Sequence, residues 1–268
     1  MFKPIATCCL AGLLSACHSP AASFNMAATQ RGFAAQQLEG QGFTHQVYQH
    51  TPASASHTRI HVYLDGDGSP WFAKRHVTQD PTPLTPTVLA LMQQDTQAAL
   101  YLGRPCYHQT GAMPANCQER LWTSARYSPE VINSMVAALR HYVQTHSYEH
   151  LTLIGFSGGG TLAMLMAPRL PETKAVVTLA GNLDTAAWVK HHRYTPLTGS
   201  LNPATQAPLP AHIQQIHAVG EKDVTIPPAL VTAAIRHQPN AQLHIFPNTD
   251  HQCCWEQHLP TLLEALVP

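Results

Sequence analysis

Charge is the first property that this sequence has little of. Only 11% of its 268 residues are Asp, Glu, Lys or Arg, and the two signs balance at 15 residues each. The chain has no basic run of the kind that binds nucleic acid, and no acidic tail. Its polarity comes partly from 18 histidines, so we expect the surface to become positive below a pH of about 6.5. Nucleic acid is therefore excluded as a partner.

Long apolar runs are missing too. Residues 5–14 form an apolar segment that is too short to span a bilayer and follows a single lysine, as in a signal peptide. The next residues, Leu14-Ser15-Ala16-Cys17, are similar to a lipobox. We predict that Cys17 becomes the palmitate-bearing N-terminus of a bacterial envelope lipoprotein that faces the periplasm or the exterior. The alternative is an ordinary secretory signal, cut near Ala16 or Ala21, with Cys17 incidental.

The ligand patterns of metal sites are absent as well. The sequence contains no Cys-x-x-Cys and no His-Glu-x-x-His, and we predict neither a metal nor an organic cofactor. Beyond the signal region, Cys106 and Cys117 bracket a short loop, and an exported protein can keep disulfides. A bridge between them would add about 3 kcal/mol of stability in the chain-entropy model. Cys253 and Cys254 are adjacent and can pair with each other or with the first two.

After residue 40 the chain alternates between strand-like and helical patterns. We expect strands at residues 44–49, 58–64, 99–102, 149–155, 174–180, 212–219 and 241–246. We expect helices at about 86–98, 128–146, 158–168, 228–237 and 255–266. An early hairpin followed by this alternation predicts an α/β fold whose mostly parallel, doubly wound sheet is covered on both faces.

The domain boundaries follow from the same patterns. We assign residues 1–16 to the signal peptide, residues 17–39 to an Ala- and Gln-rich tether, and residues 40–268 to one folded domain. Residues 181–211 hold four prolines and one short helical piece, so we expect them to form a small insertion between the strands at 174–180 and 212–219, the sixth and seventh of a sheet of about eight.

One serine is flanked by glycines at the end of a strand-like run. Gly155-Phe156-Ser157-Gly158-Gly159 fits Gly-x-Ser-x-Gly, and a helical stretch follows it at once. A strand–turn–helix of this kind lifts the hydroxyl of Ser157 above the carboxyl edge of a sheet, facing the N-terminus of a helix. The alternative is a glycine-rich turn that only packs tightly.

A serine nucleophile needs a base and a carboxylate that orients the base. Asp223 follows the strand at 212–219, and His251 follows the last strand, so the chain order is Ser, Asp, His. The other interpretations are a surface-turn aspartate and a solvated histidine. Asp184 is the reserve carboxylate, and we discount Asp250 because a neighbour of the base would point away from it.

The oxyanion of an acyl transfer also needs hydrogen-bond donors. We expect the N–H of Gly158 to be one donor. The second should lie in the loop Asp65-Gly66-Asp67-Gly68, where we assign the N–H of Asp67 and next that of Gly66. The same loop could bind a cation, but it lacks the further ligands of a calcium loop.

Across residues 40–266 the chain resembles the α/β-hydrolase superfamily, and within it a group of bacterial lipoprotein hydrolases. The stretches that carry the resemblance are 63–68, 102–106, 123–128, the serine turn and 180–184. The resemblance implies an eight-stranded sheet and a Ser157–Asp223–His251 triad. The chain departs from many esterases in the oxyanion loop, because Asp65 and Asp67 add negative charge there. Arg104 and Arg126 are candidates to neutralise that charge, or are solvated or structural arginines, and a preference for anionic substrates stays open.

We therefore predict a membrane-tethered serine hydrolase that cleaves a small-molecule or acyl ester, thioester or amide through an acyl-enzyme. The alternatives are acyl transfer by the same residues, and a non-catalytic binding lipoprotein on a hydrolase fold. The small insertion argues against a large lid. Four aromatic residues could line the pocket or fill the core: Trp71, Phe72, Trp188 and Trp255.

Overall fold

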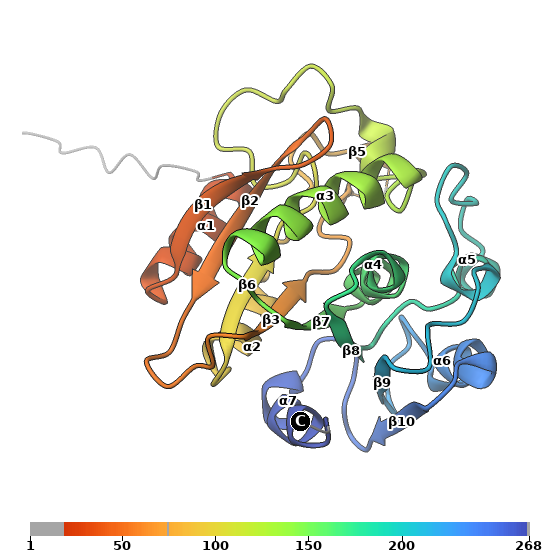
Figure 1. The fold of residues 1–268 in the computed structure, drawn as a ribbon. Coiled ribbons are helices and arrows are strands. Elements are labelled where there is room, and N and C mark those ends of the chain that lie inside the picture. Colours follow the sequence, from red (N-terminus) through yellow and green to blue (C-terminus); the bar gives the residue numbers. More distant parts are fainter. Residues whose placement is uncertain (1–18, 74, 267–268) are drawn as a thin grey trace, which may run out of the picture.

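A single large sheet forms the centre of the molecule (Figure 1). The computed structural model describes residues 19–73 and 75–266. The strands of the sheet are β1 (Ala34–Glu39), β2 (Thr44–His50), β3 (Arg59–Leu64), β6 (Ala98–Leu102), β7 (His150–Phe156), β8 (Thr173–Leu179), β9 (Gln214–Gly220) and β10 (Ala241–Phe246). Their order is β1-β2-β6-β3-β7-β8-β9-β10. All neighbours from β6 to β10 are parallel, and only β1 and β2 are antiparallel, which confirms the predicted sheet.

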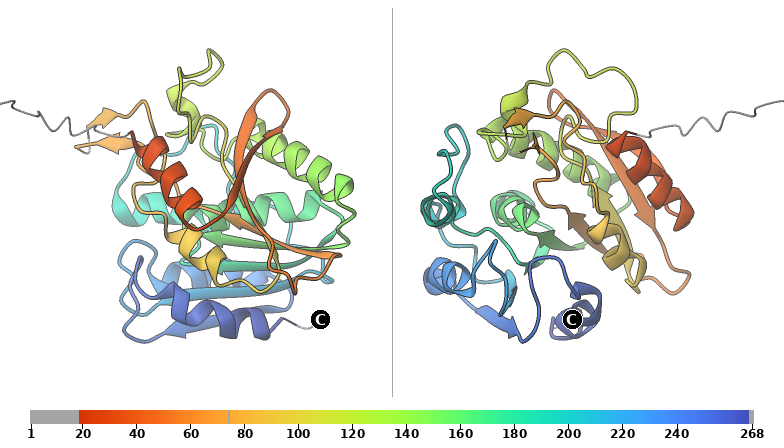
Figure 2. Two further views of the ribbon diagram at one scale, coloured as in Figure 1. Left: turned by 90° about the vertical axis from the view of Figure 1, so that its left-hand side faces the viewer. Right: turned by 180° about the vertical axis from the view of Figure 1, so that it is seen from behind.

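Helices cover both faces of this sheet (Figures 1 and 2). They are α1 (Pro20–Gln30), α2 (Thr87–Gln93), α3 (Pro129–Thr145), α4 (Gly158–Met166), α5 (Thr185–His192), α6 (Pro228–Ala234) and α7 (Trp255–Glu264). The core cluster on one face includes α3, α4 and α6, and the cluster on the other includes α1, α2 and α7. A separate hairpin, β4 (Trp71–Phe72) and β5 (His76–Val77), follows β3.

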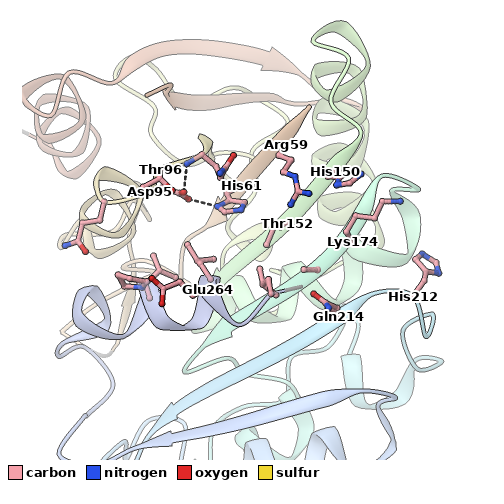
Figure 3. Close-up of a pocket in the computed structure, with 17 residues that line it drawn as sticks. Arg59, His61, Asp95, Thr96, His150, Thr152, Lys174, His212, Gln214 and Glu264 are labelled. Carbon is pink, nitrogen blue, oxygen red and sulfur yellow. Dashed lines mark hydrogen bonds and ion pairs between the residues drawn. The ribbon is translucent and has the colours of Figure 1, made fainter. Parts of the chain in front are cut away.

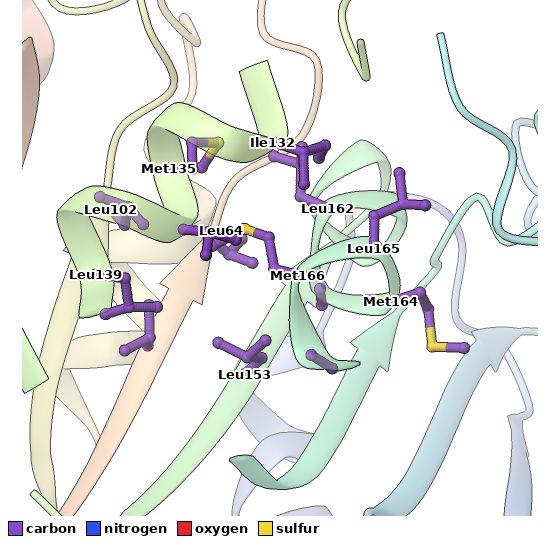
Figure 4. Packing of buried hydrophobic residues seen from close by; sticks show 14 of the residues in the cluster. Leu64, Leu102, Ile132, Met135, Leu139, Leu153, Leu162, Met164, Leu165 and Met166 are labelled. Atoms are coloured by element: carbon purple, nitrogen blue, oxygen red, sulfur yellow. The ribbon is translucent and has the colours of Figure 1, made fainter. Parts of the chain in front are cut away.

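The central strands are apolar on both faces because helices cover both. Figure 4 shows Leu64 and Leu153 of β3 and β7 packed under Ile132 of α3 and Leu162 of α4. Burying such side chains stabilises the fold by about 1.5–3 kcal/mol each. Helix α3 also begins where the sequence predicts, because the Ser128 hydroxyl accepts the N–H of Val131 as an N-cap.

The assignment of residues 17–39 to a tether needs correction. Residues 20–30 form α1, which buries Ala21, Phe24 and Ala28, and residues 34–39 form the edge strand β1. Among the described residues, the folded domain therefore already includes α1 and β1 and does not start at residue 40. Neither element has a clear apolar period in the sequence, because α1 buries mostly alanine and the side chains of β1 are largely exposed. Strand β1 is held in the sheet by its backbone pairing with β2. The predicted early hairpin of strands 44–49 and 58–64 is wrong, because β2 pairs with β1 and β6 and not with β3.

The remaining boundaries agree with the sequence to within a few residues. The insertion between β8 and β9 is small and contains α5. Helix α2 is an exception: it ends at Gln93, whereas the sequence predicted a helix to about residue 98. Within the described residues, no helix combines the length and the hydropathy that crossing a bilayer requires. Cys17 lies outside those residues, so its lipidation stays a prediction.

Candidate active site

Ser157 sits on a strained turn between β7 and α4. Its backbone has φ 52° and ψ −118°, a left-handed conformation that costs energy for a residue with a side chain. Close packing requires the two flanking glycines: a Cβ on Gly155 would collide with the carbonyl of Gly159, and a Cβ on Gly159 with the carbonyl of Leu64. The turn is fixed by the N–H of Ser157, which donates to Leu179 on β8 at 2.9 Å.

Two side chains distant in sequence reach this serine. The Nε2 atom of His251 lies 3.1 Å from Oγ of Ser157, and the Nδ1 atom lies 2.8 Å from Oδ2 of Asp223. A carboxylate only accepts, so Nδ1 carries the proton and Nε2 is free to accept from the serine hydroxyl. The other oxygen of Asp223 accepts the N–H groups of Thr225 and Ile226 at 2.8 and 2.7 Å. Asp223 is buried, and His251 is 16% exposed.

The loops that carry Asp223 and His251 are joined to each other. The N–H of Glu221 donates to Phe246, and the N–H of Lys222 donates to Thr249, both at 2.9 Å. The indole N–H of Trp255 holds the carbonyl of His251 at 3.0 Å from α7. The parallel pairing of β9 and β10 therefore brings both side chains to one edge of the sheet.

The two other carboxylates that we considered, Asp184 and Asp250, accept hydrogen bonds from residues close to them in sequence. Asp184 caps α5, because its Oδ1 accepts the N–H groups of Ala186 and Ala187. Asp250 is exposed and accepts the N–H groups of Gln252 and Cys253 in its own turn. Neither is hydrogen-bonded to His251.

The loop after β3 lies beside the serine. A Cβ on Gly66 would come 3.4 Å from Cβ of Ser157. The N–H of Gly66 already donates to Oδ1 of Asp65 at 2.8 Å, so it is not free for a substrate. For the N–H of Asp67, no acceptor exists among residues 19–73 and 75–266. Gly158 is the first residue of α4, where an N–H has no partner within the helix.

The carboxylate of Asp67 is neutralised by ion pairs. Arg126 and Arg104 contact its two oxygens at 2.7 and 3.0 Å, and the hydroxyl of Tyr127 donates to it at 2.6 Å. The hydroxyl of Tyr107 donates to the Asp67 carbonyl at 2.9 Å. We call these four partners of Asp67 the Asp67 clamp. Burial raises the pKa of Asp67, but the two guanidinium groups and Tyr127 outweigh it and lower that pKa to about 2. Burial raises the pKa of Asp65 to about 7, against the hydrogen bond from Gly66.

The sequence of this chain matches the model of one known protein family. The model of the dienelactone hydrolase family matches residues 102–258, which is more than half of the chain and includes Ser157, Asp223 and His251. The chain belongs to the dienelactone hydrolase family. It is thus a hydrolase of the α/β-hydrolase superfamily, as the resemblance implied. No curated protein matches the sequence.

Solved structures share the fold of this hydrolase at low sequence identity. An α/β serine hydrolase without a lid from Xanthomonas campestris is 15% identical, with a TM-score of 0.55 over 88% of this chain and 97% of that one. A proline iminopeptidase of Mycobacterium smegmatis is 12% identical, with a TM-score of 0.61 over 86% and 97%. An esterase of Pyrococcus furiosus is 13% identical, with a TM-score of 0.59 over 88% and 90%.

A cavity of about 870 Å³ opens in front of Ser157, and we call it the Ser157 cavity. Its wall includes Phe156, Trp71 and Leu84, and also Trp188 of α5 and Tyr194 just after this helix. Two of the four tryptophans thus line the cavity, whereas Trp255 is a core residue. Phe72 is 72% exposed.

The wall near α5 is joined to the Asp223 loop. The carbonyl of Thr225 accepts the indole N–H of Trp188 at 3.0 Å and lies 2.8 Å from Nε2 of His192. Tyr194 stacks on His192, with ring centroids 5.1 Å apart. The sequence did not indicate His192, Tyr194 or Leu84 as site residues. The available signal was weak: an aromatic cluster in a proline-rich insertion.

A second cavity, of about 490 Å³, lies at the amino edge of the parallel strands (Figure 3). There His61 contacts Asp95 at 2.7 Å, and the hydroxyl of Tyr63 donates to the same oxygen at 2.6 Å. In the described part of the chain no hydroxyl or thiol is hydrogen-bonded to Nε2 of His61, so this pair has no nucleophile beside it. Nor do the described residues contain a group of three or more His, Cys, Asp or Glu that could hold a metal ion.

Both pairs of cysteines in the described residues are disulfides. Cys106 and Cys117 are joined, with Cα atoms 5.5 Å apart, as predicted. This bridge closes the loop that supplies Tyr107 to the Asp67 clamp. Cys253 and Cys254 are joined to each other, which is one of the alternatives that the sequence left open.

Proposed function

We propose that this chain is a serine hydrolase that cleaves a carboxylic ester, thioester or amide through an acyl-enzyme on Ser157. The observation that carries the proposal is the continuous hydrogen-bonded series from Oγ of Ser157 through His251 to the buried carboxylate of Asp223. In this series His251 is held in the tautomer that accepts a proton from the serine.

The reaction follows from these contacts. As Oγ of Ser157 attacks the carbonyl carbon, its proton passes to Nε2 of His251, and Asp223 stabilises the imidazolium. His251 then protonates the leaving alcohol, thiol or amine as the bond to the carbonyl carbon breaks. A water molecule then gives a proton to the same nitrogen and attacks the acyl carbon. The bond between that carbon and Oγ breaks, and His251 returns the proton to Oγ, which releases the acid and Ser157.

We assign the oxyanion donors to the N–H groups of Gly158 and Asp67. This assignment is supported by their lack of acceptors in the described residues and by the strained turn that puts Gly158 at the start of α4. Gly66, the reserve donor of the sequence analysis, is unsuitable while Asp65 accepts its N–H. A Cβ on Gly66 would make an ordinary van der Waals contact with Cβ of Ser157, so a small residue keeps this loop close to the serine.

Fluorophosphonate labelling tests the nucleophile. We expect the wild type to be labelled and Ser157→Ala to lose the label and at least about 10³-fold of the esterase activity. Ser124→Ala is the matched control, because Ser124 lines the same cavity and its hydroxyl has no hydrogen-bond partner in the described residues. Labelling that survives in Ser157→Ala, or an unlabelled wild type, would contradict the proposal. Product analysis with added alcohols or amines separates hydrolysis from acyl transfer.

A further inference from the structure

Large apolar side chains that are exposed gather around the mouth of the Ser157 cavity. Trp71, Leu84 and Tyr194 line the cavity, and Phe72 and Val224 each adjoin a lining residue in the chain. Phe72, Leu84 and Val224 are at least 70% exposed. We call these five residues the apolar rim. A soluble protein seldom exposes such a group unless a ligand, a partner or a lipid surface covers it.

The described chain begins next to this rim. The N–H of Ala21, in the first turn of α1, donates to Oδ2 of Asp80 at 2.9 Å. Asp80 lies just after the β4–β5 hairpin that carries Trp71 and Phe72. The base of this hairpin is closed by the N–H of Ser69, which donates to Pro81. In the left view of Figure 2, the start of α1 and the hairpin lie on the same side of the molecule.

This arrangement predicts which side of the domain a lipid anchor would hold against the bilayer. Cys17 precedes Ser19 by two residues, which can span at most about 7 Å. A lipid on Cys17 would therefore hold the start of α1, and with it the hairpin, close to the bilayer. Because residues 20–30 form helix α1, an anchor at Cys17 restricts the orientation of the domain, which a long flexible tether would not do.

The charges around the rim suit anionic headgroups. Arg75 lies in the hairpin, and Lys190 and Arg193 lie between the lining residues Trp188 and Tyr194. All three are exposed, and none forms an ion pair with another described residue. Cations beside exposed aromatic and aliphatic side chains are typical of surfaces that bind the bilayer interface.

We propose that the apolar rim docks on the surface of an anionic lipid bilayer, and that the Ser157 cavity takes an acyl substrate with an apolar chain from that surface. The charge within the cavity agrees with such a substrate, since the guanidinium group of Arg126 in the cavity wall is already paired with the carboxylate of Asp67. The substrate part rests on the proposed function, whereas the docking does not.

Tryptophan fluorescence of the full chain tests the docking. The probe is a vesicle of phosphatidylglycerol and phosphatidylcholine brominated on its acyl chains, which quenches tryptophans that enter the bilayer. We expect Trp71 to give most of the quenching, because Trp71 is 47% exposed, Trp188 is only partly exposed, and Trp122 and Trp255 are buried. Trp71→Phe should remove most of the quenching. Phe72→Ser should shift the equilibrium between docked and free rim by about tenfold or more toward the free state.

Ile245→Ser is the matched control, since Ile245 is 49% exposed on the edge strand β10 and does not line the Ser157 cavity. This variant should be quenched like the wild type. An unquenched wild type, or an equal loss in Ile245→Ser and Phe72→Ser, would overturn the docking.

Rates measured on two esters distinguish the docking from the proposed hydrolysis. Phe72→Ser should lose about tenfold in rate on a long-chain ester held in vesicles and keep its rate on a water-soluble short ester. Equal rates of the wild type and Phe72→Ser on both esters would overturn the substrate part. A wild type that is quenched by the vesicles but not labelled by fluorophosphonate would overturn the proposed hydrolysis alone and would support the docking.

Discussion

Arg126 donates a hydrogen bond to the carboxylate of Asp67 at 2.7 Å, although 59 residues separate the two in the chain. Arg104 reaches the other oxygen from a third segment. A carboxylate next to a forming oxyanion would oppose catalysis if its charge were unpaired. The two positive charges of the arginines more than balance this negative charge, and their ion pairs fix Asp67 beside Gly158.

Asp67→Asn should destabilise the protein by about 3 kcal/mol or more, because it leaves two buried guanidinium groups without a counter-charge. Urea unfolding measures this loss. Tyr127→Phe, which removes one hydrogen bond to the same carboxylate, should cost about 1.5–3 kcal/mol. An Asp67→Asn protein as stable as the wild type would show that the ion pairs contribute little.

The clamp also predicts a dependence of stability on pH. Because the pKa of Asp67 is lowered to about 2 in the folded protein, its ionised form stabilises the fold fully above the unfolded pKa of 3.8. This contribution, about 2 kcal/mol, should disappear as the pH falls from about 5 to about 2. The measurement is the difference in unfolding free energy between the wild type and Asp67→Asn across that range. A difference that does not change with pH would contradict the assignment.

Asp223→Asn should lower kcat by about 10³–10⁴-fold with little change in KM, because an amide can hold His251 in the wrong tautomer. Asp184→Asn serves as the control: it changes the N-cap of α5 and should leave kcat unchanged. Steady-state kinetics on a short ester distinguishes the two. A large effect of Asp184→Asn and a small one of Asp223→Asn would reverse their roles.

Removing the Cys106–Cys117 bridge by a double substitution to serine should cost about 3 kcal/mol, since the bridge closes a loop of 11 residues. We expect kcat to fall too, because that loop holds Tyr107 against the carbonyl of Asp67. The pair Cys253 and Cys254 closes no such loop, and the same double substitution there should cost much less. Thermal unfolding and kinetics of the two variants make the comparison.

The predictable parts of the fold are those with a strong local signal. The parallel strands are apolar runs bounded by turns, and Ser128-Pro129 marks the start of α3, so both could be predicted from the sequence. Helix α1 and strand β1 could not, because alanine and exposed polar residues carry no clear period. Their place depends on a sheet edge that only the assembled chain provides.

The candidate site likewise has parts that the sequence predicts and parts that depend on the tertiary structure. The sequence alone determined the turn at Ser157, because two glycines, a strand and a helix define it within a few residues. It also ordered Asp223 and His251 after their strands. Only the tertiary structure decided which carboxylate reaches His251, which N–H groups of the oxyanion loop are free, and that Asp67 is neutralised by Arg104 and Arg126. The reason is physical: a strained turn is a local property of the backbone, whereas charge pairing depends on distances between segments that the sequence separates by tens of residues.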